Sequence, residues 1–352
     1  MLAYHVISDE AVGGAAVLLS GLVPALEARG VCSAVLLPEE SNLIPYFKNA
    51  SIPLHFLKNS GRFLPVRQVL SLCRQFKHAP PHVVVSHGSL SAKIAARLCS
   101  LPCASVKHCD LPVKGRWLYR LLTDATVATS LPCAHHLREQ GLSAVYCIEN
   151  GFSPIAVPTA RERQAARAAL SLDEDAIAVG LCGRLSAVKG QETAIRALSL
   201  LGDGGRRICL LLLGEGEDEP RLRALCHALA IEERVTFLGF RNDPTDFYHA
   251  LDIHLSCSLY SETSSLSLAE GMSAALPTVA SDTAGNRLRV ADGGLLYPAG
   301  NAEALSERLR FLMDERVRLH LQKAALSRAA RLPRHADAAK DYASLFSALC
   351  AK

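Results

Sequence analysis

The feature that most constrains the fold of this chain is a regular alternation of short apolar runs with segments of helical periodicity. Apolar runs of this length predict strands. They lie at residues 2–8, 32–38, 82–88, 103–108, 125–130, 176–183, 207–214, 235–239, 253–258 and 278–281. Such βαβ alternation predicts an α/β architecture, in which parallel sheets carry helices on both faces.

The alternation pauses around Asn150, where Pro154 and Pro158 precede a charged helical segment, and then resumes. A chain of 352 residues has room for two domains of about 150–180 residues each. We therefore predict two doubly wound, Rossmann-like domains, residues 1–155 and 156–335, that face a central cleft. In such sheets ligands bind outside the carboxyl ends of the strands, so functional residues are expected just after strands.

The positive charge of the chain lies in its first half. Residues 1–155 carry 14 Lys and Arg against 9 Asp and Glu, a difference of 14 − 9 = +5, whereas the whole chain has a net charge of +4. Two amphipathic segments contribute basic side chains: Arg67, Arg74, Lys77, Lys114, Arg116 and Arg120. The first places Val66, Val69, Leu70 and Cys73 on one expected helical face, and the second contains Trp117.

These two basic segments have two interpretations. An amphipathic basic surface docks on anionic lipid, which would give peripheral membrane contact. The alternative is a pair of ordinary helices with an apolar side toward the core and a solvated polar side. Nucleic acid is not an expected partner, because no binding motif that combines basic and aromatic residues is present.

Two carboxylates, Glu262 and Glu270, flank the spacer TSSLSLA. Glu262 follows a predicted strand, and Glu270 lies about one turn into the helix predicted over residues 266–276. Ser and Thr cap helices, and the N–H groups at a helix N-terminus bind anions such as phosphate. A carboxylate beside them can accept hydrogen bonds from the ribose diol. The pattern indicates a nucleotide-sugar site; a capping pattern with a solvated glutamate is the alternative.

A second charged group follows the predicted strand that ends at Gly183. Arg184 and Lys189 share one short loop before a helix. Two cations beside a helix N-terminus form an anion site. A surface loop with two unrelated basic residues is the alternative.

Five segments in the second half carry a family resemblance. They are GRLSAVKG, LLLGEGEDEPRLRAL, VTFLGFRNDPTDFYHALDIHLSCS, SETSSLSLAEGMSAALPTVASDTAGNR and GGLLYPAGNAEAL, in this order. Together they resemble the carboxyl-terminal domain of retaining glycosyltransferases with the GT-B fold, specifically glycosyltransferase family 4. The first half resembles the family more loosely, through the glycine turn Gly13–Gly14, the strand-end histidines His87 and His108, and the Asn150–Gly151 turn.

The resemblance implies a retaining glycosyltransferase that moves a sugar from a nucleoside-diphosphate sugar, with a UDP-sugar as the expected donor, to a hydroxyl acceptor. The expected setting is bacterial surface glycan or glycolipid synthesis. A sugar-nucleotide epimerase of the same fold and a sugar-nucleotide binding protein without turnover are the alternatives.

The resemblance also implies roles for individual residues. Arg184 and Lys189 would stabilise the leaving nucleoside diphosphate. Glu270 would bind the ribose, Glu262 the donor sugar, and His108 would lie near that sugar from the opposite domain. The other donor-binding residues that it implies are Gly13, Gly14, Gly183, Phe240, Arg241, Ser264, Ser265 and Leu266. His87 and Asn150 are expected on the acceptor side.

Neither a cofactor nor a metal is expected. The acidic tripeptide DED at residues 173–175 precedes a strand, so it lies away from the carboxyl ends where a metal-binding Asp-x-Asp would be. Catalysis would then depend on Arg184, Lys189 and helix dipoles.

The remaining expectations concern partners and location. The first domain, completed by a helix over about 336–352, would bind the acceptor, a lipid-linked or anionic glycan, and the second would bind the donor. Scattered cysteines without a C-x-x-C pair are typical of a cytoplasmic protein, and association with the inner face of a membrane stays open.

Overall fold

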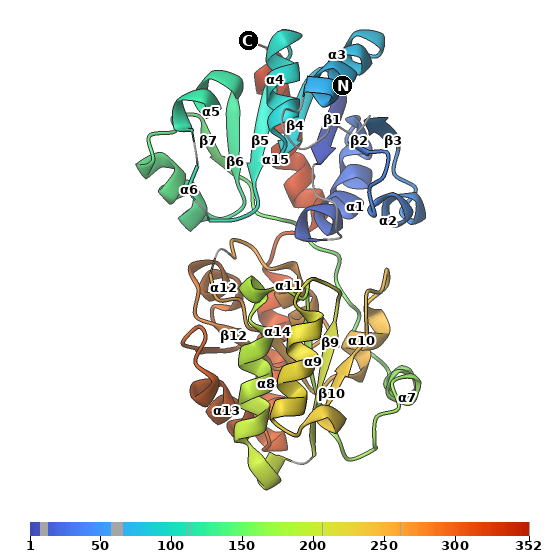
Figure 1. Ribbon diagram of the computed structural model, residues 1–352, viewed down its shortest axis with the longest axis vertical. Coiled ribbons are helices and arrows are strands. Elements are labelled where there is room, and N and C mark those ends of the chain that lie inside the picture. Colours follow the sequence, from blue (N-terminus) through green and yellow to red (C-terminus); the bar gives the residue numbers. More distant parts are fainter. Residues whose placement is uncertain are drawn as a thin grey trace. The chain divides into compact units, whose positions relative to one another are not determined.

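A computed structural model describes residues 1–7, 13–57, 66–110, 112–113, 115–205, 207–260 and 262–351. The chain divides into two compact units (Figure 1). Unit 1 comprises Met1–Phe152 and Pro333–Lys352, and unit 2 comprises Ser153–Leu332. The expected limits at residues 155 and 336 lie close to these boundaries. Ser8, the last residue of the first predicted strand, and the basic residue Lys114 lie outside the described residues.

Unit 1 is built on a parallel sheet. In its described part, seven strands follow the order β3 (Leu54–Leu57), β2 (Cys32–Pro38), β1 (Leu2–Ile7), β4 (Val83–His87), β5 (Cys103–Lys107), β6 (Ala125–Ala128) and β7 (Val145–Cys147). The central strands are almost wholly buried, as a parallel sheet covered on both faces requires. The order reverses between β1 and β4, whose register pairs Ile7 with His87.

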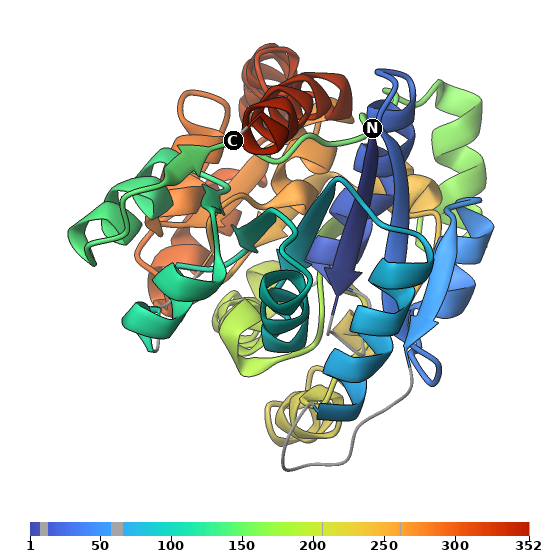
Figure 2. The same ribbon diagram turned by 90° about the horizontal axis from the view of Figure 1, so that it is seen from above.

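Helices cover both faces of this sheet. They are α1 (Gly14–Glu27), α2 (Ile44–Asn49), α3 (Val66–His78), α4 (Leu90–Leu98), α5 (Arg116–Leu122), α6 (Leu131–Glu139) and α15 (His335–Cys350). The C-terminal helix α15 packs on α1 at one face, and α3 packs on α4 at the other (Figure 2). Gly21 permits the close approach of α15, because a Cβ there would come within 2.1 Å of the His335 ring.

The apolar face predicted for α3 is only partly turned toward the core. The helix buries Val69, Leu72 and Phe76, whereas Val66 and Leu70 are 51% and 50% exposed. Residues 66, 69, 70 and 73 share one face of α3, as their spacing predicts, but Val66 and Leu70 lie at the side of that face that is turned away from the buried stripe.

Unit 2 is built on a second parallel sheet. Among the residues described, six strands follow the order β10 (Val235–Phe237), β9 (Ile208–Leu213), β8 (Ile177–Cys182), β11 (Ile253–Ser256), β12 (Thr278–Ser281) and β13 (Leu295–Tyr297). The order reverses between β8 and β11. Its α-helices are α7 (Ala160–Ala169), α8 (Gln191–Leu200), α9 (Glu219–Ala228), α10 (Thr245–Ala250), α11 (Leu266–Ser273), α12 (Ala284–Val290), α13 (Ala302–Phe311) and α14 (Glu315–Ala330).

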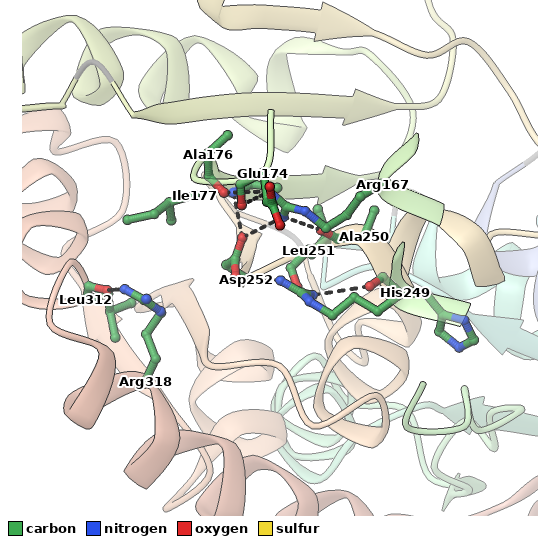
Figure 3. A network of polar contacts seen from close by, with 12 residues as sticks. Arg167, Glu174, Ala176, Ile177, His249, Ala250, Leu251, Asp252, Leu312 and Arg318 are labelled. Atoms are coloured by element: carbon green, nitrogen blue, oxygen red, sulfur yellow. Dashed lines mark hydrogen bonds and ion pairs between the residues drawn. The ribbon is translucent and has the colours of Figure 1, made fainter. Parts of the chain in front are cut away.

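The segment after Phe152 is fastened to unit 2. The backbone N–H of Ile155 donates to Ser273 Oγ at 2.9 Å, and His249 Nε2 donates to the carbonyl of Ala156 at 3.0 Å. Arg167 on α7 then bonds the Asp252 carboxylate, at 3.1 Å, and the carbonyl oxygens of Ala250 and Ala176 (Figure 3). Helix α7 therefore belongs to the second unit, where it covers the end of α10 and the start of β11.

Candidate functional site

The charged residues predicted in the second half meet at the point where the strand order of unit 2 reverses. The loop after β8 carries Arg184 and Lys189, and the loop after the neighbouring strand β11 carries Glu262. A crevice outside the carboxyl ends of the strands at such a switch point is where open α/β sheets bind ligands. The topology therefore brings together residues that are more than 70 positions apart.

Lys189 and Glu262 form an ion pair. Lys189 Nζ lies 2.6 Å from Glu262 Oε2, and the same oxygen accepts a hydrogen bond of 2.9 Å from Ser258 Oγ. Burial raises the pKa of the Glu262 carboxyl, but the Lys189 ammonium, with Ser258 and Arg289, outweighs it, so the net shift is downward. Glu262 is therefore a carboxylate with a cation already beside it.

Local backbone geometry explains why Lys189 reaches that carboxylate. Gly190 has φ +65, and a Cβ at this position would lie 2.1 Å from the carbonyl oxygen of Cys257, just after β11. The N–H of Leu259 also donates to the carbonyl of Val188 at 2.8 Å. Glycine is thus required for the loop after β8 to pack on the end of β11.

Glu270 lies on α11 in a different environment. The hydroxyl of Tyr248, a fully buried residue of α10, donates to Glu270 Oε2 at 2.7 Å. Burial raises the pKa of Glu270, while the Tyr248 hydrogen bond and the charge of Arg289 oppose this shift. Tyr248 occupies one carboxylate oxygen and so orients the group.

The N-terminus of α11 lies between the two glutamates in sequence. Ser265 caps it by accepting from the N–H of Leu268 at 3.4 Å, and its first turn contains no acidic residue. Ser264 is 8% exposed, and within the described part of the chain its buried Oγ has no hydrogen-bond partner. Leu266 begins the helix. A positive helix end beside a buried unsatisfied hydroxyl is suited to an anion.

The remaining predicted residues of unit 2 lie at the same sheet edge. Arg184 is exposed, and its guanidinium has no ion-pair partner among the residues that the structure describes. Gly183 faces Lys189, since a Cβ would lie 3.9 Å from that side chain. Phe240 and Arg241 follow β10; Phe240 is 38% exposed and donates its N–H to Glu215 Oε1 at 3.3 Å.

Sequence reasoning missed three residues of this site: Ser258, Tyr248 and Arg289. Arg289 on α12 is 3% exposed, and its charge opposes the upward effect of burial on the pKa of both glutamates. A Cβ at Gly285 would lie 2.2 Å from the carbonyl oxygen of Glu262. Because glycine has no side chain, α12 can approach the loop that carries Glu262. In sequence, NRLRVAD resembles a solvated helix, and Tyr248 is one of several core-facing aromatics. Neither segment carries a signal that marks it as functional.

The predicted residues of unit 1 also follow its strands at the switch point. Gly13 is the N-cap of α1, with no side-chain cap and no acidic residue in the first turn. A Cβ at Gly14 would meet no atom within 4 Å, so packing within the unit does not require glycine there. His87 ends β4 and His108 follows β5; their rings stack, with Nδ1 of His87 2.8 Å from Nε2 of His108.

Asn150 lies elsewhere in unit 1. It is 7% exposed, and the adjacent Gly151 packs on the chain entering α15, since a Cβ would lie 2.5 Å from the Arg334 backbone. Its acceptor-side role stays a prediction.

No group of three or more His, Cys, Asp or Glu side chains placed to hold a metal occurs within the described residues. None of the helices described is long and apolar enough to cross a membrane.

Two family models match adjacent parts of the chain. The model described as Glycosyltransferase Family 4 matches residues 12–154, and the model described as Glycosyl transferases group 1 matches residues 162–331. Among curated relatives, a D-inositol 3-phosphate glycosyltransferase of Stackebrandtia nassauensis is 31% identical over 187 residues, which are 49% of this chain and 42% of the relative. The lipopolysaccharide core biosynthesis glycosyltransferase LpsE of Rhizobium meliloti is 27% identical over 202 residues, 56% of this chain and 57% of LpsE. The chain thus spans about half the length of the curated relatives it matches.

Solved structures share the fold of the whole chain. HepE of Anabaena in complex with UDP-glucose has a TM-score of 0.86 at 20% identity, covering 99% of this chain and 100% of that one. WaaG, a glycosyltransferase involved in lipopolysaccharide biosynthesis, has a TM-score of 0.79 at 17% identity, covering 99% and 100%. The two parallel sheets with flanking helices therefore have the GT-B fold. With both family models matching in order along it, the chain belongs to the GT-B glycosyltransferases of the family 4 type.

Proposed function

We propose that this protein transfers a sugar from a UDP-sugar to a hydroxyl acceptor with retention of the anomeric configuration. The observation that carries the proposal is the meeting of Lys189, Glu262 and the N-terminus of α11 at the switch point of unit 2. These groups match the parts of a sugar nucleotide: cations and N–H groups for the diphosphate, carboxylates for the sugar and ribose hydroxyls. The HepE complex with UDP-glucose and the LpsE and WaaG names support the donor and a role in surface glycan synthesis.

In this mechanism the protein stabilises charge that grows on the leaving group. As the bond from the anomeric carbon to the phosphate oxygen breaks, negative charge accumulates on UDP. Arg184, Lys189 and the N–H groups at the start of α11 would stabilise that charge. Glu270, oriented by Tyr248, would hold the ribose of donor and product alike. Glu262 would exchange the Lys189 ammonium for hydroxyls of the donor sugar.

The test is a donor panel assayed for release of nucleoside diphosphate, with and without candidate hydroxyl acceptors. UDP release that requires an acceptor, with an NMR spectrum showing the anomeric configuration of the donor in the product, is the expected result. Conversion of the donor into an epimer without transfer would identify an epimerase. Tight donor binding without any turnover would identify a binding protein, and inversion would refute retention.

We also propose that unit 1 contacts anionic membranes, where a lipid-linked acceptor would lie. Exposed apolar side chains accompany the basic ones: Val66 and Leu70 with Arg67 and Arg74 on α3, and Trp117 and Leu121 with Arg116 and Arg120 on α5. Trp117 is 71% exposed. Apolar groups that enter the interface beside cations that meet anionic headgroups are the chemistry of peripheral binding.

Trp117 is the single tryptophan of the chain, so its fluorescence reports on this surface alone. We expect a blue shift when vesicles containing anionic lipid are added, and none with zwitterionic vesicles. The double variant Arg116→Ser/Arg120→Ser should lose the shift, while Arg223→Ser, an exposed arginine of unit 2, should keep it. An unchanged wild-type spectrum with both vesicle types would refute membrane contact through α5.

A further inference from the structure

Three histidines from adjacent strands form a continuous hydrogen-bonded row in unit 1. His5 lies in β1, His87 ends β4 and His108 follows β5. Nδ1 of His5 is 3.1 Å from Nε2 of His87, and Nδ1 of His87 is 2.8 Å from Nε2 of His108. His5 is fully buried, His87 is 2% exposed, and His108 is half-buried at the outer end. His87 and His108 were predicted as site residues from the sequence, whereas His5 was not.

The protonation state of the row follows from its burial. Burial lowers the pKa of His5 and of His108 to about 4, and it lowers the pKa of His87 well below its usual value, with further lowering from the neighbouring imidazoles. Near neutral pH each ring is therefore neutral and carries one N–H and one lone pair.

Two hydrogen bonds among three neutral imidazoles must run in the same direction. In the outward arrangement, His5 Nδ1–H donates to His87 and His87 Nδ1–H donates to His108, so the proton of His108 is on Nδ1. In the inward arrangement, His108 Nε2–H donates to His87 and His87 Nε2–H donates to His5, which leaves the proton of His5 on Nε2. The position of one proton thus determines all three.

The inner end of the row favours the outward arrangement. His5 Nε2 is buried and has no hydrogen-bond partner within the described part of the chain, and the rings of His5 and Phe346 pack edge to face with their centroids 6.4 Å apart. The inward arrangement would place an unpaired N–H in this apolar environment. Buried N–H groups without an acceptor are rarer in proteins than acceptors that lack a donor.

We propose that His5 and His87 are positioning residues that hold His108 in the tautomer with its proton on Nδ1. His108 then meets its ligand as a fixed hydrogen-bond donor at the carboxyl edge of the first sheet. The inference rests on the proposed function, since the ligand would be a hydroxyl or ring oxygen of the sugar substrates. Because the proton of His108 would already be on Nδ1, the ring would not have to change tautomer when the ligand binds.

Long-range ¹H–¹⁵N NMR spectra of the histidine rings test the proposal directly, because they distinguish protonated from unprotonated ring nitrogens. The sample is the intact chain without ligand at neutral pH. We expect His108 and His87 to be protonated on Nδ1 and unprotonated on Nε2. A proton on Nε2 of His108, or a mixture of both tautomers in the wild type, would overturn the proposal.

Two variants at the inner end provide a matched comparison. His5→Asn keeps an N–H donor close to the position of Nδ1, whereas His5→Leu removes it. We expect His108 to keep its tautomer in His5→Asn and to populate both in His5→Leu; an unchanged His108 in folded His5→Leu would refute the role of His5. His135→Gln, at a 77% exposed position on α6, is the control and should leave His108 unchanged. If His5→Leu does not fold, the wild-type and His5→Asn spectra decide.

Turnover provides a second measurement. We expect His5→Leu to lower kcat/KM by about tenfold, a typical effect of losing a group that fixes a histidine tautomer, and His5→Asn to restore it. A loss of the same size in both variants would indicate a purely structural role. Absence of turnover in the wild type would count against the proposed function, whereas the NMR spectra would still decide the role of His5.

Discussion

Replacing each site glutamate by glutamine should change the affinity for UDP in opposite directions. Glu262→Gln removes the charge that holds Lys189, and Glu270→Gln removes the acceptor expected for the ribose. Both substitutions preserve size, and a glutamine at residue 270 can still accept from Tyr248. UDP contains ribose and diphosphate but no donor sugar, so it separates the two roles.

The structure sets the size of each effect. The Lys189–Glu262 pair is partly solvated, with side-chain exposures of 34% and 14%, so we assign it about 1 kcal/mol, the upper end for exposed ion pairs. Freeing Lys189 for the diphosphate should tighten UDP binding about fivefold. Loss of a charged hydrogen bond at Glu270 should cost about 1.5–3 kcal/mol, which weakens UDP binding about 10- to 150-fold.

Isothermal titration calorimetry with UDP measures both effects. Glu233→Gln, an exposed carboxylate of the same unit, is the control and should leave the affinity unchanged. With a UDP-sugar as ligand, Glu262→Gln should not bind more tightly than the wild type, because the variant lacks the carboxylate that accepts hydrogen bonds from the sugar hydroxyls. If the two variants shift the affinity for UDP in the same direction, the glutamates do not divide the donor as proposed.

Three further outcomes are expected. Arg184→Ala should lower kcat/KM, mainly through kcat, by an amount that corresponds to about 2–4 kcal/mol of transition-state stabilisation, because the guanidinium would act on charge that grows during transfer. Wild-type activity in this variant would show that Arg184 has no part in the mechanism. Turnover should persist in EDTA, and loss that Mg²⁺ or Mn²⁺ restores would reveal a metal requirement. Unit 1 should lose stability as the pH falls from about 6.5 toward 4. In the folded protein, burial lowers the pKa of His5 and of His108 to about 4, so both rings stay neutral in this window. In the unfolded chain the same two histidines bind protons at about pH 6.5, which stabilises the unfolded state as the pH falls. Melting temperatures followed by circular dichroism should show a steeper fall for wild type than for His5→Leu, and equal slopes would contradict this.

The central strands could be predicted from the sequence, and several edge strands could not. β9, with the sequence ICLLLL, lies within the run predicted at residues 207–214, because a strand buried on both faces must be apolar throughout. The edge strands β3, β7 and β13 have only three or four residues. Runs this short have no clear period, and their pairing with a neighbour determines that they are strands.

Helix α14 was also missed. It extends over sixteen residues, yet it buries only Ala325 and Ala329. Its sequence has no continuous apolar stripe, which is the signal that predicts an amphipathic helix.

The residues of the candidate site could be predicted from the sequence, but the contacts between them could not. Arg184, Lys189 and Glu262 lie in the loops after β8 and β11, and Glu270 lies in the helix after β11. Parallel strands place the segments that follow them at one edge of the sheet. That Lys189 would meet Glu262 depends on the contact between Gly190 and Cys257, which is long-range in sequence. His5 was missed for a similar reason, because a histidine in a buried strand gains a partner only once β4 lies beside β1.

The short spacer between Glu262 and Glu270 has a consequence for how donor recognition would be coupled. Thr263, Ser264 and Ser265 are buried, and Gly285 lets α12 pack against the Glu262 backbone. Small residues are therefore needed to bring the N-terminus of α11 close to both carboxylates. A diphosphate that binds there needs Lys189, which Glu262 holds, so under the proposed function Lys189 would leave Glu262 as the phosphate arrives. The carboxylate would then be stranded at a partly buried position unless sugar hydroxyls replace the ammonium. A nucleotide with the correct sugar satisfies both charges at once, whereas UDP alone satisfies only the lysine, and the ion pair would thereby link phosphate binding to recognition of the sugar.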